Sequence, residues 1–175
     1  MRVATAADVP ALAALRASWG ASLGGGTTEG AGTDDLTARL RRWWERQPGA
    51  RTAWLAVEGE RSVGMVNVAV FERMPHAGRP DAHWAYLANL WVEPDRRRRG
   101  IASALLSAVL DWSRAEGMER VVLNPSETSL PLYRSLGFRP ADDRLRLDRG
   151  GGGDLIPVRC GDTGQGRDGG GRRPL

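Results

Sequence analysis

The chain has 175 residues, a length typical of one domain, and 41% of them are apolar, which is enough for one hydrophobic core. Its formal net charge is only +4 although its pI is about 10.4, because every basic side chain besides histidine is an arginine. Arginine does not deprotonate in proteins, so the high pI alone does not indicate a nucleic-acid-binding protein.

Cysteine and histidine usage limits redox and metal chemistry. Cys160 is the only cysteine, which excludes an intramolecular disulfide and fits a reducing compartment. Two histidines, His76 and His83, and one distant cysteine are too few ligands for a typical metal site, so we expect no metal. The sequence shows no signal peptide and no long apolar run, so we expect a cytoplasmic protein without a membrane partner.

Apolar periodicity, glycine and proline divide the chain into short strands and amphipathic helices. The first half of the chain is expected to contain, in order, a strand at 2–4, a helix over Val9 to Trp19 capped by Thr5 or Asp8, a Gly/Thr-rich loop at 20–32, a helix capped by Asp34 that carries Leu36, Leu40, Trp43 and Trp44 and ends at 48–49, and a hairpin of strands 52–57 and 62–71. The second half is expected to contain a loop at 73–82, a strand at 86–92, a helix that starts at Ile101 and is ended by Gly117 as its C′ residue, a strand at 119–123, a short helix at 129–136, and a one-sided strand around Leu145 and Leu147.

The stretch from Asn89 to Gly117 organises the rest. A nearly apolar strand is stopped by Pro94, which has no N–H for the strand ladder, and the next helix begins just after Gly100. A helix N-terminus presents unpaired backbone N–H groups, and glycine lets an anion approach them closely. With the flanking run of arginines, this turn predicts a cradle for a phosphorylated ligand.

The arginine-rich turn is compatible with simpler or different chemistry as well. A bare arginine run is often a solvated basic loop, but the strand–turn–helix context favours phosphate binding. A P-loop would need Gly-x-x-x-x-Gly-Lys, and the chain has no lysine; the Rossmann pattern Gly-x-Gly-x-x-Gly is also absent here. The turn therefore predicts a phosphate site of a third kind.

Two motifs resemble those of the GNAT N-acetyltransferase superfamily. The run from Arg97 to Ala102, Arg-Arg-Arg-Gly-Ile-Ala, is similar to its Arg/Gln-x-x-Gly-x-Gly/Ala signature, and Leu-Trp-Val-Glu-Pro precedes it as in the family. Downstream, 132–138 reads Leu-Tyr-Arg-Ser-Leu-Gly-Phe, which matches the family's Leu-Tyr-x-x-x-Gly-Phe. The resemblance covers 2–149 in outline and is strongest over 86–138.

The resemblance implies an α/β (α+β) GNAT fold, with a central, mixed, mostly antiparallel sheet that splays between two central strands and is flanked by helices. The domain would occupy 1–149, and the Gly/Arg-rich segment 150–175 would be a disordered tail, in which 155–158 could dock weakly. Acetyl-CoA would be the cosubstrate, its pantetheine arm lying along the strand like an added strand. The implied cofactor-binding residues are Leu90, Trp91, Val92, Arg97, Arg98, Arg99, Gly100, Ile101, Ala102, Ser103 and Ser126.

The same resemblance implies direct attack of a primary amine on the thioester, with a backbone N–H near Val92 stabilising the oxyanion. Tyr133 matches the family tyrosine that protonates the departing thiolate; a purely structural core tyrosine is the alternative. The general base is not evident, because the central strands offer Tyr86, Asn89 and Asn124 but no carboxylate, and Glu93 already begins the loop. Ser126 replaces the family's loop asparagine.

The acceptor is expected between the first two helices and their loop, and it could be a small-molecule or a peptide amine. Two other classes stay open. A non-catalytic acyl-CoA-binding module would explain the missing base. A nucleic-acid binder using Arg96 to Arg99 is disfavoured, because no regularly spaced basic helix or aromatic platform accompanies them. The sequence does not decide the oligomeric state, and a homodimer is compatible with it.

Overall fold

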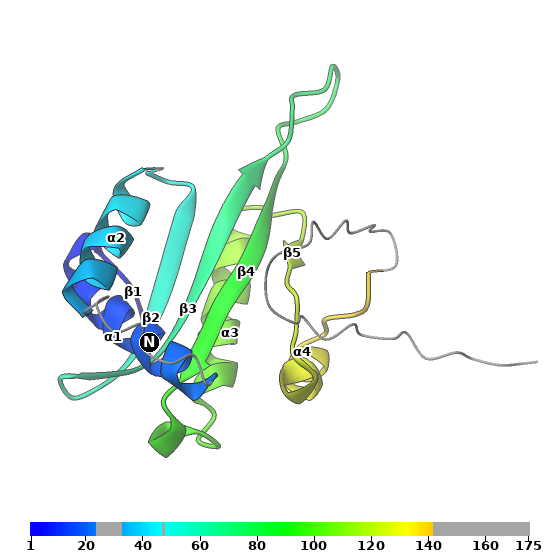
Figure 1. Ribbon diagram of the computed structural model, residues 1–175. Helices are drawn as coiled ribbons and strands as arrows, with labels where there is room; N and C mark the ends of the chain where they lie inside the picture. The colour runs from blue at the N-terminus through cyan, green and yellow to red at the C-terminus, as the bar shows by residue number, and fades with distance from the viewer. Residues whose placement is uncertain (24–32, 47, 142–175) are drawn as a thin grey trace, which may run out of the picture. The chain divides into compact units, whose positions relative to one another are not determined.

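The computed structural model describes residues 1–23, 33–46 and 48–141 (Figure 1). The chain divides into two units, Met1–Asn124 and a second unit that begins at Pro125. The first unit is built on a five-stranded sheet in the order β1-β2-β3-β4-β5, antiparallel throughout except for the parallel pair β4–β5. The expected mixed, mostly antiparallel sheet is therefore confirmed. Its strands are β1 (Arg2–Val3), β2 (Arg51–Glu58), β3 (Arg61–Glu72), β4 (His83–Val92) and β5 (Val121–Val122).

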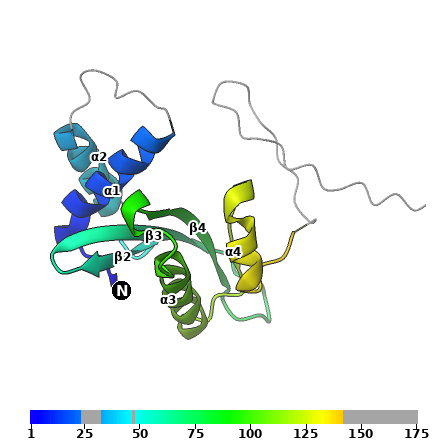
Figure 2. The same ribbon diagram turned by 90° about the horizontal axis from the view of Figure 1, so that it is seen from below.

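Helices cover both faces of this sheet. Helices α1 (Val9–Ser22) and α2 (Thr33–Glu45) lie over one face, and α3 (Ile101–Ala115) lies over the other (Figure 2). Strand β2 packs against helices on both faces of the sheet, because its successive side chains point to opposite faces. Leu55 is fully buried with Leu12 and Leu15 of α1, whereas the ring of its neighbour Trp54 meets Trp112 of α3 edge-on at 5.3 Å.

Helix starts and stops follow the expected local chemistry. The N–H of Thr5 donates to the Asp8 carboxylate at 2.8 Å, which closes a short 3-10 turn, η1 (Ala6–Asp8), ahead of α1. Helix α3 ends just before Gly117, which has a left-handed φ of 65° and is the helix terminator that the sequence predicted. None of the helices in the described ranges is long and apolar enough to cross a membrane.

Four of the expected element boundaries are wrong. Helix α1 continues through Gly20 to Ser22, since one glycine costs a helix only about 1 kcal/mol. Helix α2 already begins at Thr33, one residue before the expected start at position 34. Strand β4 starts at His83 rather than Tyr86, because Trp84 stacks on Phe71 at 4.4 Å and extends the hairpin. Strand β5 has two residues rather than five.

The second unit begins at Pro125 and contains the 3-10 helix η3 (Glu127–Ser129) and α4 (Leu130–Ser135). Helix α4 agrees with the short helix expected at 129–136, whereas η3 was not expected. The strand expected around Leu145 and Leu147, the tail from 150 onward and the weak docking patch at 155–158 lie outside the described residues. The domain limits of 1–149 remain a prediction.

Gly64 sets how closely α3 approaches the sheet. A Cβ built there would lie 3.0 Å from the carbonyl oxygen of Trp91 and 3.3 Å from both Ile101 and Leu105. We expect Gly64→Ala to lower the free energy of unfolding by about 1–3 kcal/mol, because the backbone or α3 must shift. Gly20→Ala is the control, since its Cβ meets nothing within 4 Å and should stabilise α1. Urea denaturation measures both, and equal stability of the two variants would contradict this account of the packing.

Candidate active site

Strand β4 has one open edge. It pairs with β3 from His83 to Val92, but with β5 only at Ala85 and Tyr86. Beyond Tyr86 no described strand continues the ladder on that side, because β5 is short and ends there (Figure 1). An unpaired strand edge can hydrogen-bond an extended ligand as if it were an added strand. The segment 87–92 therefore presents such an edge, and it contains the predicted residues Leu90, Trp91 and Val92.

A β-bulge lies in the middle of this edge. Asn67 pairs with Ala88 and Met65 with Trp91, so Asn89 and Leu90 together face the single residue Val66. Asn89 has a φ of 55°, a left-handed conformation that asparagine tolerates better than most residues. A bulge bends its strand and redirects side chains, which here places the Asn89 amide on the α1–α2 face. Its Nδ2 donates to Oδ1 of Asn67 at 2.5 Å.

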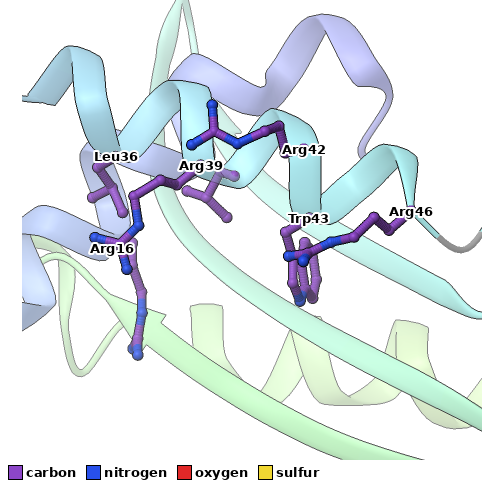
Figure 3. A pocket seen from close by; sticks show the side chains of 7 residues that line it. Arg16, Leu36, Arg39, Arg42, Trp43 and Arg46 are labelled. Atoms are coloured by element: carbon purple, nitrogen blue, oxygen red, sulfur yellow. The ribbon is translucent and has the colours of Figure 1, made fainter.

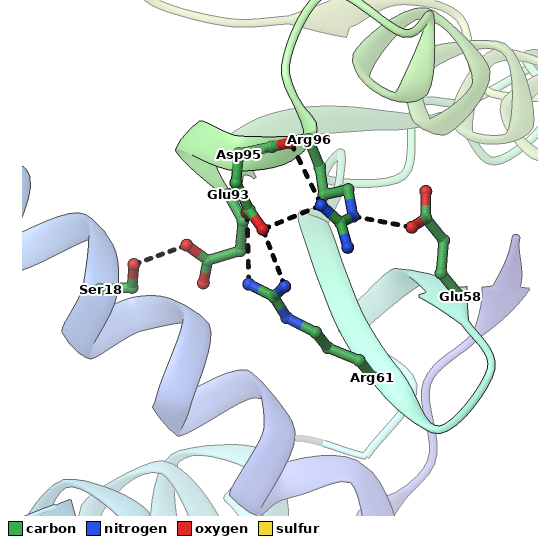
Figure 4. Close-up of polar contacts among 6 residues, drawn as sticks. All are labelled: Ser18, Glu58, Arg61, Glu93, Asp95 and Arg96. Atoms are coloured by element: carbon green, nitrogen blue, oxygen red, sulfur yellow. Dashed lines mark hydrogen bonds and ion pairs between the residues drawn. The ribbon is translucent and has the colours of Figure 1, made fainter.

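The arginine turn after β4 is fixed to the β2–β3 hairpin (Figure 4). A 3-10 turn, η2 (Pro94–Arg96), follows the strand, as the expected stop at Pro94 requires. Arg96 Nε lies 2.8 Å from the Glu58 carboxylate, and Arg61 contacts Asp95 at 2.8 Å. Exposed ion pairs of this kind each contribute about 0–1 kcal/mol, so they orient the turn more than they stabilise the fold.

The three arginines predicted to contact the cofactor differ in their surroundings. Arg97 donates from Nε to the Val92 carbonyl at 3.0 Å, and its guanidinium lies 4.5 Å from the centre of the Trp91 ring. It thus ties the turn to the end of β4. Arg98 and Arg99 are exposed, and neither has an ion pair or side-chain hydrogen bond within the described ranges. They remain available to a ligand.

Gly100 opens α3 with unpaired amides. It has a φ of 76°, in the left-handed region that favours glycine, and directly precedes the helix. The first helical hydrogen bond runs from the Ala104 N–H to the Gly100 carbonyl at 2.9 Å. The N–H groups of the three residues between them, Ile101, Ala102 and Ser103, have no acceptor among the described residues. Such a group of free amides at a helix N-terminus suits a pyrophosphate.

A pocket of about 240 Å³ opens beside the bulge on the α1–α2 face. Its polar lining consists of Arg16, Asn67 and Asn89, and no carboxylate, histidine or cysteine of the described chain lines it. Sequence reasoning singled out Asn89 but not Asn67, which the hairpin register brings beside it. The lining residues are Leu12, Arg16, Leu40, Trp43, Ala53, Met65, Val66, Asn67 and Asn89.

A second pocket of about 420 Å³ adjoins the first, since Arg16, Leu40 and Trp43 line both (Figure 3). We call the first the inner pocket and the second the outer pocket. The rim of the outer pocket is strongly basic, and no pattern in the sequence predicted it. Leu36 and Leu40 form its apolar wall, and its cations are Arg16, Arg39, Arg42 and Arg46.

Glu93 was the carboxylate that the sequence placed closest to the central strands as a candidate general base, but its side chain is bound to α1. It accepts a hydrogen bond from the Ser18 hydroxyl of α1 at 2.8 Å, and it lines neither pocket (Figure 4). Among the described residues, no group of three or more His, Cys, Asp or Glu side chains is arranged to hold a metal ion.

Tyr133 and Ser126 lie in the second unit. Tyr133 is buried, its ring packs edge-on against Phe138 at 5.6 Å, and burial raises the pKa of its hydroxyl to about 12. That hydroxyl has no hydrogen-bond partner in the described part of the chain, and it stays protonated at neutral pH. Ser126 is exposed, and its hydroxyl lies 2.9 Å from that of Ser129. The structure tests neither residue's predicted role.

The family is decided by comparison with known proteins. The family model "Acetyltransferase (GNAT) family" matches residues 18–138, which include the open strand edge, the glycine turn and the Tyr133 segment. The chain belongs to the GNAT family. The resemblance drawn from the two sequence motifs is thereby confirmed.

Individual GNAT relatives match over parts of their length. Glucosamine 6-phosphate N-acetyltransferase of Trypanosoma brucei brucei is 34% identical over 88 residues, half of this chain and 58% of that protein. N-alpha-acetyltransferase RimI of Mycobacterium tuberculosis is 32% identical over 102 residues, 58% of this chain and 63% of RimI. The chain therefore spans less than two thirds of either relative.

Solved structures agree on the fold. A predicted acetyltransferase from Clostridium acetobutylicum, crystallised with acetyl-CoA, superimposes with a TM-score of 0.67 at 21% identity. The match covers 84% of this chain and 94% of that one. This likeness shows that the GNAT fold extends over most of the chain.

Proposed function

We propose that this protein is an N-acetyltransferase that transfers the acetyl group of acetyl-CoA to a primary amine. The observation that carries the proposal is the continuity of two binding features, the open edge of β4 and the free amides that follow Gly100. Together they fit an extended pantetheine arm that ends in a pyrophosphate. Acetyl-CoA supplies an activated thioester, and the residues of this chain bind and orient the two reactants.

In this proposal the edge from Leu90 to Val92 holds the pantetheine arm, and the N–H groups of Ile101, Ala102 and Ser103 hold the pyrophosphate. Arg98 and Arg99 add positive charge beside the phosphates. A free backbone N–H near Val92 would bind the developing oxyanion. Arg97, because it is occupied by Val92 and Trp91, would shape the turn rather than contact the ligand.

The acceptor amine would enter through the inner pocket and meet the amides of Asn67 and Asn89. These side chains can accept hydrogen bonds from an amine but cannot remove its proton at neutral pH. The neutral amine attacks the thioester carbonyl, the C–S bond breaks, and the surplus proton of the nitrogen passes to water. We propose that Tyr133 donates a hydrogen bond to the departing sulfur, on the strength of its motif and its protonated hydroxyl.

The proposal is tested by following free thiol released from acetyl-CoA over a panel of primary amines. One relative is named for glucosamine 6-phosphate and another for N-alpha-acetylation, so the panel contains amino sugars, small amines and peptides with free N-termini. Turnover with at least one amine supports the enzyme. CoA binding without turnover of any amine would favour a non-catalytic acyl-CoA-binding module, and absence of CoA binding would contradict both.

The pH dependence should reveal whether the protein supplies a base. None of the described inner-pocket residues titrates between pH 5 and 9, so we expect kcat/KM to rise tenfold per pH unit up to the acceptor's own pKa. That limit should therefore differ between an alkylamine, with a pKa of about 10.4, and an α-amine, with a pKa of about 8. A plateau at the same pH for both acceptors would indicate a protein base and contradict the expectation.

A further inference from the structure

The outer pocket gathers positive charge that has little compensation. Four arginines line it, and no acidic side chain of residues 1–23, 35–46 and 48–141 lines either pocket. Asp35 is 3.7 Å from Arg39 and offsets only that residue. Arg42 and Arg46 have no ion pair with the described chain, and arginine keeps its charge at any physiological pH. The outer pocket is therefore positively charged and suited to bind an anion.

Arg16 connects this charge to the inner pocket, because it lines both cavities. Its guanidinium lies 4.5 Å from the centre of the Trp19 ring, and burial lowers its pKa. No carboxylate of the described residues pairs with it. Arg16 is an exposed cation that keeps its charge, and a bound anion would supply a counter-charge.

Trp43 lies at the boundary between the inner and the outer pocket. Its ring borders both pockets, and Arg51 lies 4.6 Å from the ring centre while donating to the Trp43 carbonyl at 3.2 Å. The amides of Asn67 and Asn89 line only the inner pocket, whereas the guanidiniums of Arg39, Arg42 and Arg46 line only the outer one, with Arg16 shared between them. A molecule that spans both pockets would place a neutral amine inside and a negative group outside.

We propose that the acceptor is a small amine that also carries a phosphate or carboxylate, with its amine at Asn67 and Asn89 and its anionic group on Arg16 and Arg42. This assignment rests on the proposed N-acetyltransferase function and names its substrate class. Arg39 and Arg46 contribute long-range attraction at the rim. The same charges repel polycationic amines, so a polyamine or another multiply charged amine would be a poor acceptor.

The test compares amines that differ only in the anionic group, with CoA present at saturation so that the cofactor turn is occupied. Suitable pairs are 2-aminoethyl phosphate against ethanolamine and glucosamine 6-phosphate against glucosamine, with spermidine as the polycation. Calorimetry with CoA present gives Kd, and separate assays of thiol release from saturating acetyl-CoA, without added CoA, give KM and kcat. We expect the anionic member of at least one pair to bind about 10- to 100-fold more tightly, the usual worth of a charge-assisted contact.

Arginine variants locate the effect. Arg16→Gln and Arg42→Gln should each weaken the preferred anionic amine about tenfold or more and change its neutral partner less than about twofold. Arg42→Glu should reverse the preference toward spermidine. Arg114→Gln is the matched control, because Arg114 lies on α3, pairs with Asp111 at 2.7 Å and lines neither pocket.

Equal affinity within every pair, or equal losses of both members in the arginine variants, would overturn the proposal. So would a wild-type protein that binds CoA but none of the anionic amines, or one that prefers an acidic peptide N-terminus to every small amine. Failure of the proposed function is distinguishable, because it appears as absent CoA binding in the first titration. In that case the amine pairs are titrated by calorimetry without CoA, and their relative affinities test the anion preference independently of the proposed function.

Discussion

Gly100→Val is expected to weaken CoA binding by about 100-fold or more. The Gly100 backbone begins the row of free amides, and a branched side chain there would occupy the space through which a pyrophosphate reaches them. Losing even two charge-assisted hydrogen bonds costs roughly 3–6 kcal/mol. In the ligand-free protein a Cβ at Gly100 meets nothing within 4 Å, so an internal clash cannot explain the loss. Calorimetric titration with CoA measures the effect.

The left-handed conformation of Gly100 complicates this substitution, because any side chain there costs roughly 1–2 kcal/mol. Gly117→Val is the matched control. Gly117 has a φ of 65°, also has open space at its Cβ, and ends the same helix. Both variants should lose similar stability in thermal unfolding, and only Gly100→Val should lose CoA affinity. Wild-type affinity in Gly100→Val would mean that the phosphate cradle has been misplaced.

Tyr133→Phe is expected to lower kcat about 10- to 100-fold while leaving the CoA Kd and the melting temperature nearly unchanged. The pKa of Tyr133 is about 12, and a thiol has a reference pKa of ~8.5. Complete proton transfer from this tyrosine to a thiolate is therefore unfavourable by roughly 5 kcal/mol. A hydrogen bond to the developing sulfur charge does not carry that cost, and it is typically worth about 1.5–3 kcal/mol.

The other tyrosine of the chain provides the comparison. Tyr86→Phe removes a hydroxyl from β4 and should leave kcat within about twofold, since that group has no role in the proposed chemistry. Steady-state kinetics at saturating acetyl-CoA separate the two variants. An unchanged kcat in Tyr133→Phe would remove the hydroxyl from the mechanism. A large loss of stability would instead assign Tyr133 to the core, where its ring packs against Phe138.

Much of the cofactor side could be predicted from sequence because it depends on local backbone chemistry. A strand stop, a left-handed glycine and a helix N-terminus are encoded within a few consecutive residues, here from Pro94 to Ser103. The Arg97–Ala102 motif and the Tyr133 motif, in this order and at this spacing, indicated the GNAT family, which the comparisons confirmed. The boundary error at Gly20 has a different cause: one glycine is a weak stop signal that costs a helix only about 1 kcal/mol, and α1 continues through exposed residues to Ser22.

The acceptor side depends on residues that only folding brings together. Asn89 was visible as the polar exception in an apolar strand, but its left-handed bulge and its contact with Asn67 follow from the β3–β4 register. Arg16 and Arg42 belong to different helices and become neighbours because both helices pack on one face of the sheet. The sequence by itself determined the family and the position of the strand–glycine–helix turn that we propose binds phosphate, because a turn is a local structure. The pocket and its charge were decided by tertiary structure, because strand register and helix packing are non-local.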